Sequence, residues 1–397
     1  MKSILMKTGT CMALAAILAS CSGPKAPQPQ LTKSGLDPQQ FADTINGKVT
    51  GLYTLTNQNG MEVCITNVGG RIVSLMALDR DGNLQDVVLG MPSAKAYANV
   101  DGTTPSDYGS AIGRYANRIG GSVYVQDGDT VKLPANDHGN CLHGGPRGWQ
   151  YQVYDVVSVS PSALTLQIVG PDGEGKELGE GLTGFPGKVT AQVTYTLSDD
   201  NQLRIDYSAT VEDKPTVINM TNHSYFCLCG KPAENSVCAD SLWINSTAVT
   251  PTDDKLIPTG EIMQIEPGST FDFSTMKAIG QNINDDNQQI KYAGGIDHNW
   301  VLNTNGDLSQ KALVLYSPAS GIELTEYTTE PGVQVYTANF QDGKTIGKQG
   351  VGNPYRSAVC LESQKYPDSP NKSEWPSATL RPGETYQSTT IFAFSVR

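Results

Sequence analysis

The sequence predicts an all-β protein, a large antiparallel β-sandwich, and three observations support that fold class. From residue 49 onward the chain is a series of short segments in which apolar and polar residues alternate, the period of a strand with one buried face. Glycine, asparagine, aspartate and proline separate these segments, as they do in hairpin turns. No segment shows long helical periodicity. Strands without intervening helices form antiparallel sheets that pack face to face.

Residues 1–20 predict an exported protein. Two lysines, Lys2 and Lys7, precede an apolar run from Met12 to Ala19 that is too short to span a bilayer but has the layout of a secretory signal. The run ends in Leu18-Ala19-Ser20-Cys21, which resembles the bacterial lipobox, where the cysteine is lipidated and becomes the first residue of the mature protein. A plain signal peptide is the alternative interpretation.

The lipobox predicts a lipoprotein anchored to a membrane through Cys21. Residues 22–38 are rich in Pro, Gln, Lys, Ser and Gly and have almost nothing to bury, so we expect residues 21–45 to form a flexible tether. Ser22 rather than an acidic residue follows Cys21, which favours the outer membrane, facing the periplasm. Residues 46–397 contain no internal repeat and no further linker, so we expect them to form one β-sandwich domain.

Four segments show the strand pattern most clearly. Two of them contain a turn, one at Asp200-Asn201 and one at Ala319–Gly321, and we interpret each as a hairpin. The segments are VYVQDGDTVKL (123–133), ALTLQIVG (163–170), VTAQVTYTLSDDNQLRIDYSATV (189–211) and ALVLYSPASGIELTEYT (312–328).

A later segment, SAVCLESQKYPDSPN (357–371), places a carboxylate in an apolar strand. The four residues before Glu362 leave neither face polar, so the pattern predicts a strand that is buried on both sides and ends near Glu362. A carboxylate in that position must be paired, protonated or functional. Glu362 is therefore a candidate catalytic group.

The charge and the cysteines limit the partners and the covalent chemistry. The net charge is −12, and the sequence has no cluster of Lys and Arg that could bind a phosphate backbone. We therefore expect a small neutral partner and no nucleic acid. The cysteines after Cys21 are scattered, and two of them lie in strand-like apolar runs, so we expect buried free thiols and predict no disulfide. These cysteines are Cys64, Cys141, Cys227, Cys229, Cys238 and Cys360.

Four histidines are the candidate acids and bases. His143 lies in NCLHGGPRGW, where the two following glycines permit close backbone approach or positive φ. His223 lies in INMTNHSYF, and a histidine between aromatic residues is by itself more often a core residue than a catalytic one. His298 follows Asp297 in GGIDHNW, and His138 lies in the loop ANDHGN, where we expect a solvated side chain.

The sequence favours neither a metal site nor a phosphate site. His138 and His143 are five residues apart in a Gly-Asn loop, and the chain has no HExxH motif and no CxxC pair. The DGKT segment at 342–345 lacks the upstream glycine of a phosphate-binding loop, because Ala338 occupies that position. We therefore expect no metal site.

Six segments together resemble, in order and roughly in spacing, the signature segments of the aldose 1-epimerase (galactose mutarotase) family. The resemblance covers the chain from about residue 45 to the C-terminus. It departs at Cys227, where the family often has Asn, and at Trp300, where Phe is commoner. The segments are GRYANRIGG (113–121), LHGG (142–145), TNHSYF (221–226), DHNW (297–300), TTEPGVQVYTANF (328–340) and LESQKYPDSPN (361–371).

The resemblance implies a β-sandwich of the galactose mutarotase-like type, with a site in a cleft on one sheet and no cofactor. It implies an isomerase that interconverts the α and β anomers of free aldoses such as galactose and glucose. By position it implies Glu362 as general base and His223 as general acid, with His143 assisting at the ring oxygen. The residues at its substrate-binding positions are Asn117, Arg118, Asp297 and Gln334.

The chemistry of anomer exchange suits these groups. One proton must leave the C1 hydroxyl, and a second must reach the ring oxygen. A carboxyl with an ordinary pKa of about 4.3 is ionised at neutral pH and can accept the first, and an imidazole with a pKa of about 6.5 can supply the second.

Two other classes of function remain as alternatives: a non-catalytic carbohydrate-binding protein, and a glycoside hydrolase that uses two carboxylates such as Glu362 and Asp297. The histidines weigh against both. Trp149, Trp300 and Tyr336 either stack on a sugar face or belong to the core.

Overall fold

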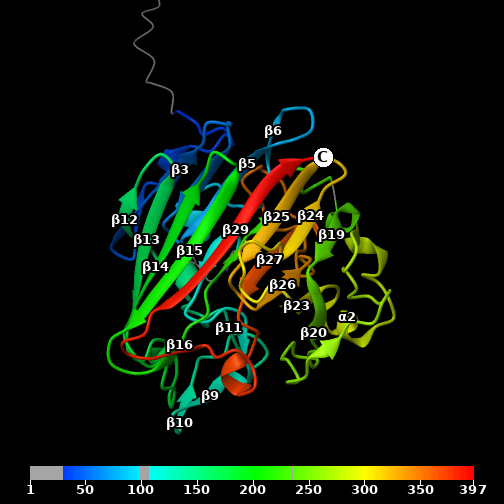
Figure 1. Cartoon of the computed structure of the whole chain (residues 1–397). Helices are drawn as coiled ribbons and strands as arrows, with labels where there is room; N and C mark the ends of the chain where they lie inside the picture. The colour runs from blue at the N-terminus through cyan, green and yellow to red at the C-terminus, as the bar shows by residue number, and fades with distance from the viewer. Residues whose placement is uncertain (1–29, 99–106, 235) are drawn as a thin grey trace, which may run out of the picture.

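The computed structural model describes residues 30–98, 107–234 and 236–397, and strands dominate it (Figure 1). The described residues contain two short α-helices, α1 (Ala94–Tyr97) and α2 (Gln288–Ala293), together with single 3-10 turns. The all-β prediction is confirmed. No helix among the described residues has the length and apolar composition needed to cross a membrane. The predicted signal sequence and Cys21 lie outside these residues.

A nine-stranded antiparallel sheet forms one layer of the molecule. Burial alternates along its central strands, so one face of each strand lies in the core and the other faces outward. The C-terminal strand β29 is inserted between β15 and β25 and so joins the two halves of the sheet. In spatial order the strands are β12 (Asp155–Val159), β13 (Ala163–Gly170), β14 (Val189–Leu197), β15 (Gln202–Val211), β29 (Tyr386–Val396), β25 (Ile322–Thr328), β24 (Leu313–Tyr316), β19 (Ser241–Ile244) and β22 (Lys277–Ala278).

Both predicted hairpins of this sheet are present. β14 and β15 pair from Leu197 and Leu203 outward, so the turn contains Asp200-Asn201 as expected. β24 and β25 pair in the same way on either side of residues 317–321. The segment predicted at 163–170 is β13.

A six-stranded antiparallel sheet forms the second layer and lies behind the long strands in Figure 1. A large hydrophobic core contains Leu361 and Val333 from this sheet and Leu324 and Phe392 from the nine-stranded sheet. The sheets therefore pack face to face. The strands, in order, are β18 (Tyr225–Phe226), β27 (Val359–Gln364), β26 (Gly332–Tyr336), β23 (Asp297–Leu302), β20 (Ser246–Thr250) and β21 (Met263–Gln264).

Smaller sheets complete the fold. The predicted segment at 123–133 is a separate hairpin. The four-stranded sheet is β3 (Leu52–Thr56), β4 (Glu62–Thr66), β5 (Arg71–Leu78) and β6 (Leu84–Asp86). The two-stranded pairs are β1 (Asp43–Ile45) with β2 (Lys48–Thr50), β7 (Ser110–Ile112) with β17 (Thr221–His223), β8 (Arg118–Ile119) with β11 (Cys141–Leu142), β9 (Val123–Gln126) with β10 (Asp129–Lys132), and β16 (Thr216–Val217) with β28 (Thr379–Leu380).

The folded domain begins earlier than the boundary predicted between residues 45 and 46. Leu36 is 5% exposed, Phe41 is fully buried, and β1 ends at Ile45. The backbone N–H of Lys33 also donates a hydrogen bond of 2.7 Å to Glu62 Oε1. Two apolar side chains in a largely polar segment are enough to hold it against the sheets, so residues 36–45 are part of the domain rather than of a tether.

The two tryptophans left open by the sequence belong to the interior. Trp149 and Trp300 are both fully buried in the main core. Trp149 Nε1 donates to Glu174 Oε1 at 3.1 Å, and Trp300 Nε1 donates to the Phe271 carbonyl oxygen at 3.2 Å. Neither ring is available to a sugar.

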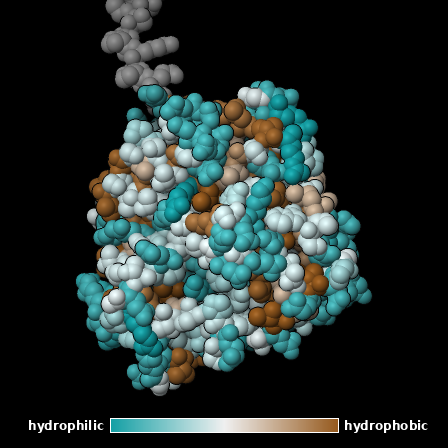
Figure 2. Space-filling view, viewed as in Figure 1, coloured by the Kyte–Doolittle hydropathy of each residue, from teal (hydrophilic) through white to brown (hydrophobic). Residues whose placement is uncertain are grey.

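The surface is mostly polar. Figure 2 shows a largely hydrophilic face on which hydrophobic residues form scattered small groups. Cys64 and Cys360 are fully buried, as predicted, and the six cysteines from Cys64 onward are free thiols.

Candidate active site

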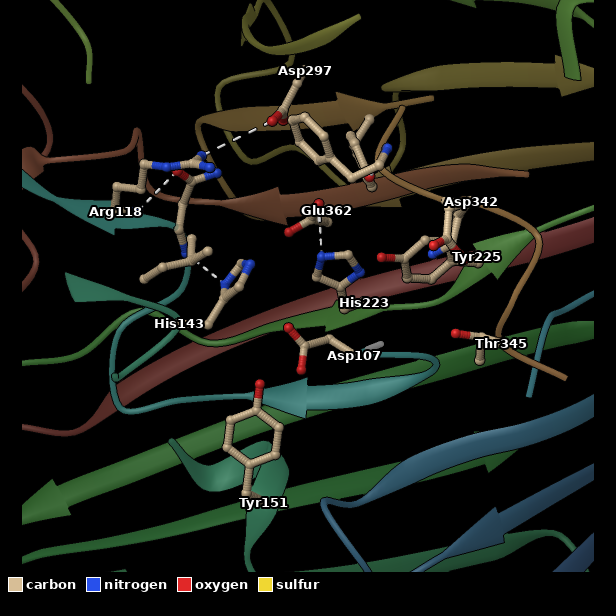
Figure 3. A pocket seen from close by; sticks show the side chains of 15 residues that line it. Asp107, Arg118, His143, Tyr151, His223, Tyr225, Asp297, Asp342, Thr345 and Glu362 are labelled. Atoms are coloured by element: carbon tan, nitrogen blue, oxygen red, sulfur yellow. Dashed lines mark hydrogen bonds and ion pairs between the residues drawn. The ribbon is translucent and has the colours of Figure 1, made fainter. Parts of the chain in front are cut away.

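A cavity of about 350 Å³ lies beside the six-stranded sheet and receives most of the predicted site residues (Figure 3). Ten polar or charged side chains, three tyrosines and a phenylalanine line it, together with Leu142. Its lining residues are Asp107, Asn117, Arg118, Leu142, His143, Tyr151, His223, Tyr225, Asp297, Tyr336, Phe340, Gln341, Asp342, Thr345 and Glu362.

The register of three neighbouring strands brings Glu362 and Asp297 to one face of the sheet. Gln334 on β26 pairs with Glu362 on β27 and with Asn299 on β23, so these side chains point the same way. Asp297 lies two residues before Asn299 and shares its face. The intervening residues Leu361 and Val333 point into the core instead.

Glu362 is almost fully buried, with 2% of its surface exposed. It lies within β27, two residues before the strand ends, rather than at the strand's end as the sequence predicted. Its Oε1 is 3.6 Å from His223 Nε2, and its Oε2 is buried without a hydrogen-bond partner. Burial raises the pKa of this carboxyl well above its ordinary value, the carboxylates of Asp297 and Asp107 raise it further, and Arg118 opposes them.

His223 is the last residue of β17, and its ring lies next to the Glu362 carboxyl group in the cavity (Figure 3). Its ring stacks on Tyr225 at 5.1 Å, and it meets the His143 ring edge-on, also at 5.1 Å. Its Nδ1 is buried and has no hydrogen-bond partner. Burial lowers the pKa of His223 from its ordinary value, whereas the Asp107 carboxylate raises it.

His143 has a defined neutral tautomer. Its Nδ1 accepts a hydrogen bond of 3.0 Å from the backbone N–H of Asn117, so the ring proton must be on Nε2. Burial and the neighbouring His223 lower the pKa of His143 well below its ordinary value. His143 and Gly144 both have positive φ, 51° and 78°, as the glycines after the histidine suggested. The side chain is therefore a fixed N–H donor.

Arg118 and its neighbours form a polar clamp on the same side. The Asn117 Oδ1 accepts from the Arg118 backbone N–H at 2.8 Å, and Arg118 Nε donates to Asp137 Oδ2 at 2.7 Å. Arg118 Nη1 is 4.0 Å from Asp297 Oδ2, and Gln334 Nε2 donates to Asp297 Oδ1 at 2.7 Å. All seven predicted site residues of the domain therefore gather in one region, with Gln334 behind Asp297.

The other histidines lie elsewhere. The His138 side chain is 79% exposed, as expected for a solvated loop residue. His298 is buried and points away from Asp297's face, and burial lowers its pKa to about 3. Its Nδ1 accepts from the Asp297 backbone N–H at 3.1 Å, so it supports the strand.

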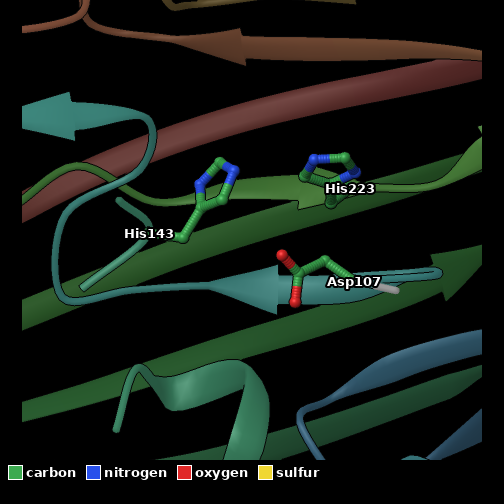
Figure 4. Close-up of side chains that lie close together, drawn as sticks. All are labelled: Asp107, His143 and His223. Carbon is green, nitrogen blue, oxygen red and sulfur yellow. The ribbon is translucent and has the colours of Figure 1, made fainter. Parts of the chain in front are cut away.

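Sequence reasoning missed Asp107 and the loop of Phe340 to Thr345 among the lining residues. Asp107 precedes the GRYANRIGG motif by six residues and belongs to no strand, so no local pattern distinguishes it. Only its proximity to His143 and His223 reveals it (Figure 4).

A profile of the family described as aldose 1-epimerase matches residues 51–393. The chain belongs to the aldose 1-epimerase family. It is accordingly an isomerase. Galactose mutarotase of Mus musculus is 39% identical over 340 residues, 85% of this chain and 92% of that one. Aldose 1-epimerase of Escherichia coli K12 is 36% identical over 355 residues, 88% and 96% of the two chains.

Solved structures of the family share the fold. A crystal structure of an aldose epimerase homologue from C. elegans superimposes with a TM-score of 0.78 at 28% identity, covering 88% of this chain and 99% of that one. A galactose 1-epimerase from Lactobacillus acidophilus gives a TM-score of 0.75 at 26% identity, with coverage of 89% and 97%. The sandwich predicted from the resemblance is therefore of the galactose mutarotase-like type.

Proposed function

We propose that this aldose 1-epimerase family member interconverts the α and β anomers of free hexoses such as galactose and glucose, with Glu362 as base and His223 as acid. The observation that carries the proposal is the Glu362–His223 pair, a carboxyl group and an imidazole that are both buried, lie 3.6 Å apart and line a cavity with other hydrogen-bonding groups. Binding alone does not require a buried acid and base. Anomer exchange requires both.

In the proposed reaction Glu362 takes the proton of the C1 hydroxyl, and the electron pair of that O–H bond forms the C1 carbonyl. The bond between C1 and the ring oxygen breaks, and the ring oxygen takes a proton from His223. Rotation about the C1–C2 bond presents the other face of the aldehyde. Ring closure then reverses both transfers and returns each proton to its source.

His143 and the Arg118 clamp hold the sugar in this scheme. The Nε2–H of His143 points a fixed donor at the cavity and suits the ring oxygen, which only accepts hydrogen bonds. Arg118 and Asp297 offer charged donors and acceptors to ring hydroxyls, and such bonds are stronger than neutral ones. A neutral polyhydroxylated ligand also suits a protein of net charge −12.

The reaction requires Glu362 to be ionised and His223 to be protonated. Burial raises the pKa of Glu362 and lowers the pKa of His223, so the uncharged pair is favoured over the reactive one, in which Glu362 is ionised and His223 protonated. Charges around His223 therefore affect how often the reactive pair forms.

Polarimetry tests the function. Freshly dissolved α-galactose and α-glucose should reach their equilibrium rotation much faster with the protein than without it. A spontaneous rate of equilibration, together with sugar binding by calorimetry, would indicate a binding protein instead. Release of a chromogenic aglycone from a glycoside would indicate a hydrolase.

We also propose that the chain is a lipoprotein anchored through Cys21, in the outer membrane and facing the periplasm. The support is the lipobox Leu18-Ala19-Ser20-Cys21 with its lysine-flanked apolar run and the following Ser22. Cys21→Ala should release an active domain into the soluble fraction on cell fractionation. A variant that sediments with membranes as the wild type does would refute the anchor.

A further inference from the structure

Asp107 is held beside His223 by the backbone of a neighbouring strand. The Asp107 carbonyl oxygen accepts hydrogen bonds from the N–H and the Oγ–H of Ser110, at 3.1 and 2.7 Å. Ser110 begins β7 and pairs with His223 on β17, and the Gly109 N–H donates to the His223 carbonyl oxygen at 2.9 Å. The position of Asp107 relative to His223 is therefore fixed by main-chain contacts.

The Asp107 carboxylate faces the two imidazoles. One side-chain nitrogen or oxygen atom from each of Asp107, His143 and His223 lies within 4.8 Å of the other two (Figure 4). Asp107 Oδ1 is buried and has no hydrogen-bond partner, and the Tyr151 side chain lies near the carboxyl group (Figure 3). Among the described residues, no Lys or Arg forms an ion pair with Asp107.

Of the two imidazoles, His223 is the one that can become a cation there. Its Nδ1 is buried and unpartnered, so a second ring proton displaces no hydrogen bond. His143 differs because its Nδ1 already accepts the Asn117 N–H, and protonation would break that bond. A carboxylate with a buried, unpartnered oxygen is unfavourable without a counter-ion, and so is a buried imidazolium, so each stabilises the other.

The same tautomer argues against a metal ion between the three groups. Two histidines and a carboxylate are a common ligand set for transition metals, which bind the imidazole lone pair. In His143 the Nδ1 lone pair is occupied by Asn117, and Nε2 carries the proton. The trio is better suited to holding a proton than a metal.

We propose that Asp107 is a positioning residue that favours the protonated, proton-donating form of His223, opposite Glu362. The expected effect of Asp107 on kcat rests on the proposed function. Its expected effect on the protonation of His223 does not. Arg71 of β5 opposes Asp107, because its guanidinium disfavours the imidazolium. The titratable and charged groups around His223 are Glu362 (β27), His143 (after β11), Asp107 (before β7), Arg71 (β5), Tyr225 (β18) and Tyr336 (β26).

The first test measures protonation directly, by NMR titration of the histidine ring C–H signals, with His223 assigned by its loss in His223→Gln. In Asp107→Asn the midpoint of His223 should fall by about 1 unit or more, since an opposite charge within 4–6 Å typically contributes that much. Asp107→Glu should restore most of the shift. Asp342→Asn is the matched control, because it removes a carboxylate from the same cavity. Lys344 Nζ lies 2.7 Å from Asp342 Oδ2 and already neutralises that charge. An unmoved midpoint in Asp107→Asn overturns the proposal.

The second test is kinetic and is made with EDTA present. Asp107→Asn should lower kcat about tenfold for each unit by which the His223 midpoint falls, because the reactive pair becomes rarer by that factor. A change in KM alone, with kcat and the midpoint unchanged, would identify Asp107 as a sugar contact and refute the positioning role. A wild-type protein without mutarotase activity would instead refute the proposed function, while leaving the NMR result valid.

Discussion

Glu362→Gln separates the catalytic value of the carboxylate from its effect on stability. The amide keeps the shape and hydrogen-bonding reach of the side chain, so the 3.6 Å approach to His223 can be kept, but it cannot accept a proton from the sugar. A general base typically contributes about 10² to 10⁴-fold. We expect kcat/KM to fall by that factor.

The same substitution should make the protein more stable at neutral pH. Glu362 is 2% exposed, one of its oxygens has no partner, and its pKa is raised well above the ordinary value. A raised pKa means that the folded state holds the proton more tightly than the unfolded chain, so the ionised carboxyl lowers the free energy of unfolding. Each unit of the rise is worth about 1.4 kcal/mol.

The direction of the Glu362 pKa shift determines the pH range in which wild type and variant differ in stability. Below the unfolded pKa of about 4.3 the carboxyl is protonated in both states, and wild type and Gln variant should unfold at similar temperatures. As pH rises toward the raised folded pKa, wild type loses stability relative to the variant. The gap in unfolding midpoint should therefore open above about pH 4.3 and widen as the pH approaches the raised folded pKa.

The assay is polarimetry of α-galactose, with thermal unfolding followed by circular dichroism. Glu326→Gln is the matched control. Glu326 is also buried, and it accepts a hydrogen bond from Ser363, the neighbour of Glu362 in β27, whose side chain points away from the cavity. The control should keep its rate. A well-folded Glu362→Gln variant that equilibrates α-galactose within threefold of wild type would refute the assignment and leave Glu362 as a buried ion-pair partner.

Three further predictions concern the clamp, the histidine loop and the core. Arg118→Lys should lower kcat/KM although charge is kept, because an ammonium cannot contact Asp137 and Asp297 together as the guanidinium does; an unchanged kcat/KM would remove Arg118 from the site. Gly144→Ala should lower kcat, because φ is +78° and a Cβ would lie 2.5 Å from the Gly113 carbonyl oxygen, which displaces His143; full activity with an unchanged fold would show that the loop adapts. Glu326→Gln should match wild-type stability near pH 4 and exceed it by a margin that grows up to about pH 8, because burial raises the pKa of Glu326 to about 8 and the folded state then holds a proton that the unfolded chain releases above about pH 4.3; a stability difference that stays constant across pH 4–9 would contradict this.

Much of the fold was readable because it depends on local pattern. Alternating burial in β14 and β15 repeats the alternation of their residues, and the Asp200-Asn201 turn lies where the pattern breaks. Residues 36–45 were wrongly assigned to the tether because their burial does not depend on a local pattern. Leu36 and Phe41 are isolated apolar residues, and only their contacts with distant strands show that they are buried.

By itself the sequence determined the strands, the hairpins, the free buried thiols and, through family resemblance, the residues that gather in the cavity. The tertiary structure decided the protonation states and tautomers of those residues. The tautomer of His143 depends on Asn117, 26 positions away, and the raised pKa of Glu362 depends on burial and on Asp297 and Asp107. Electrostatic energy falls with distance through space, not along the chain, so Asp107 stays invisible until β7 and β17 pair and place it beside His223.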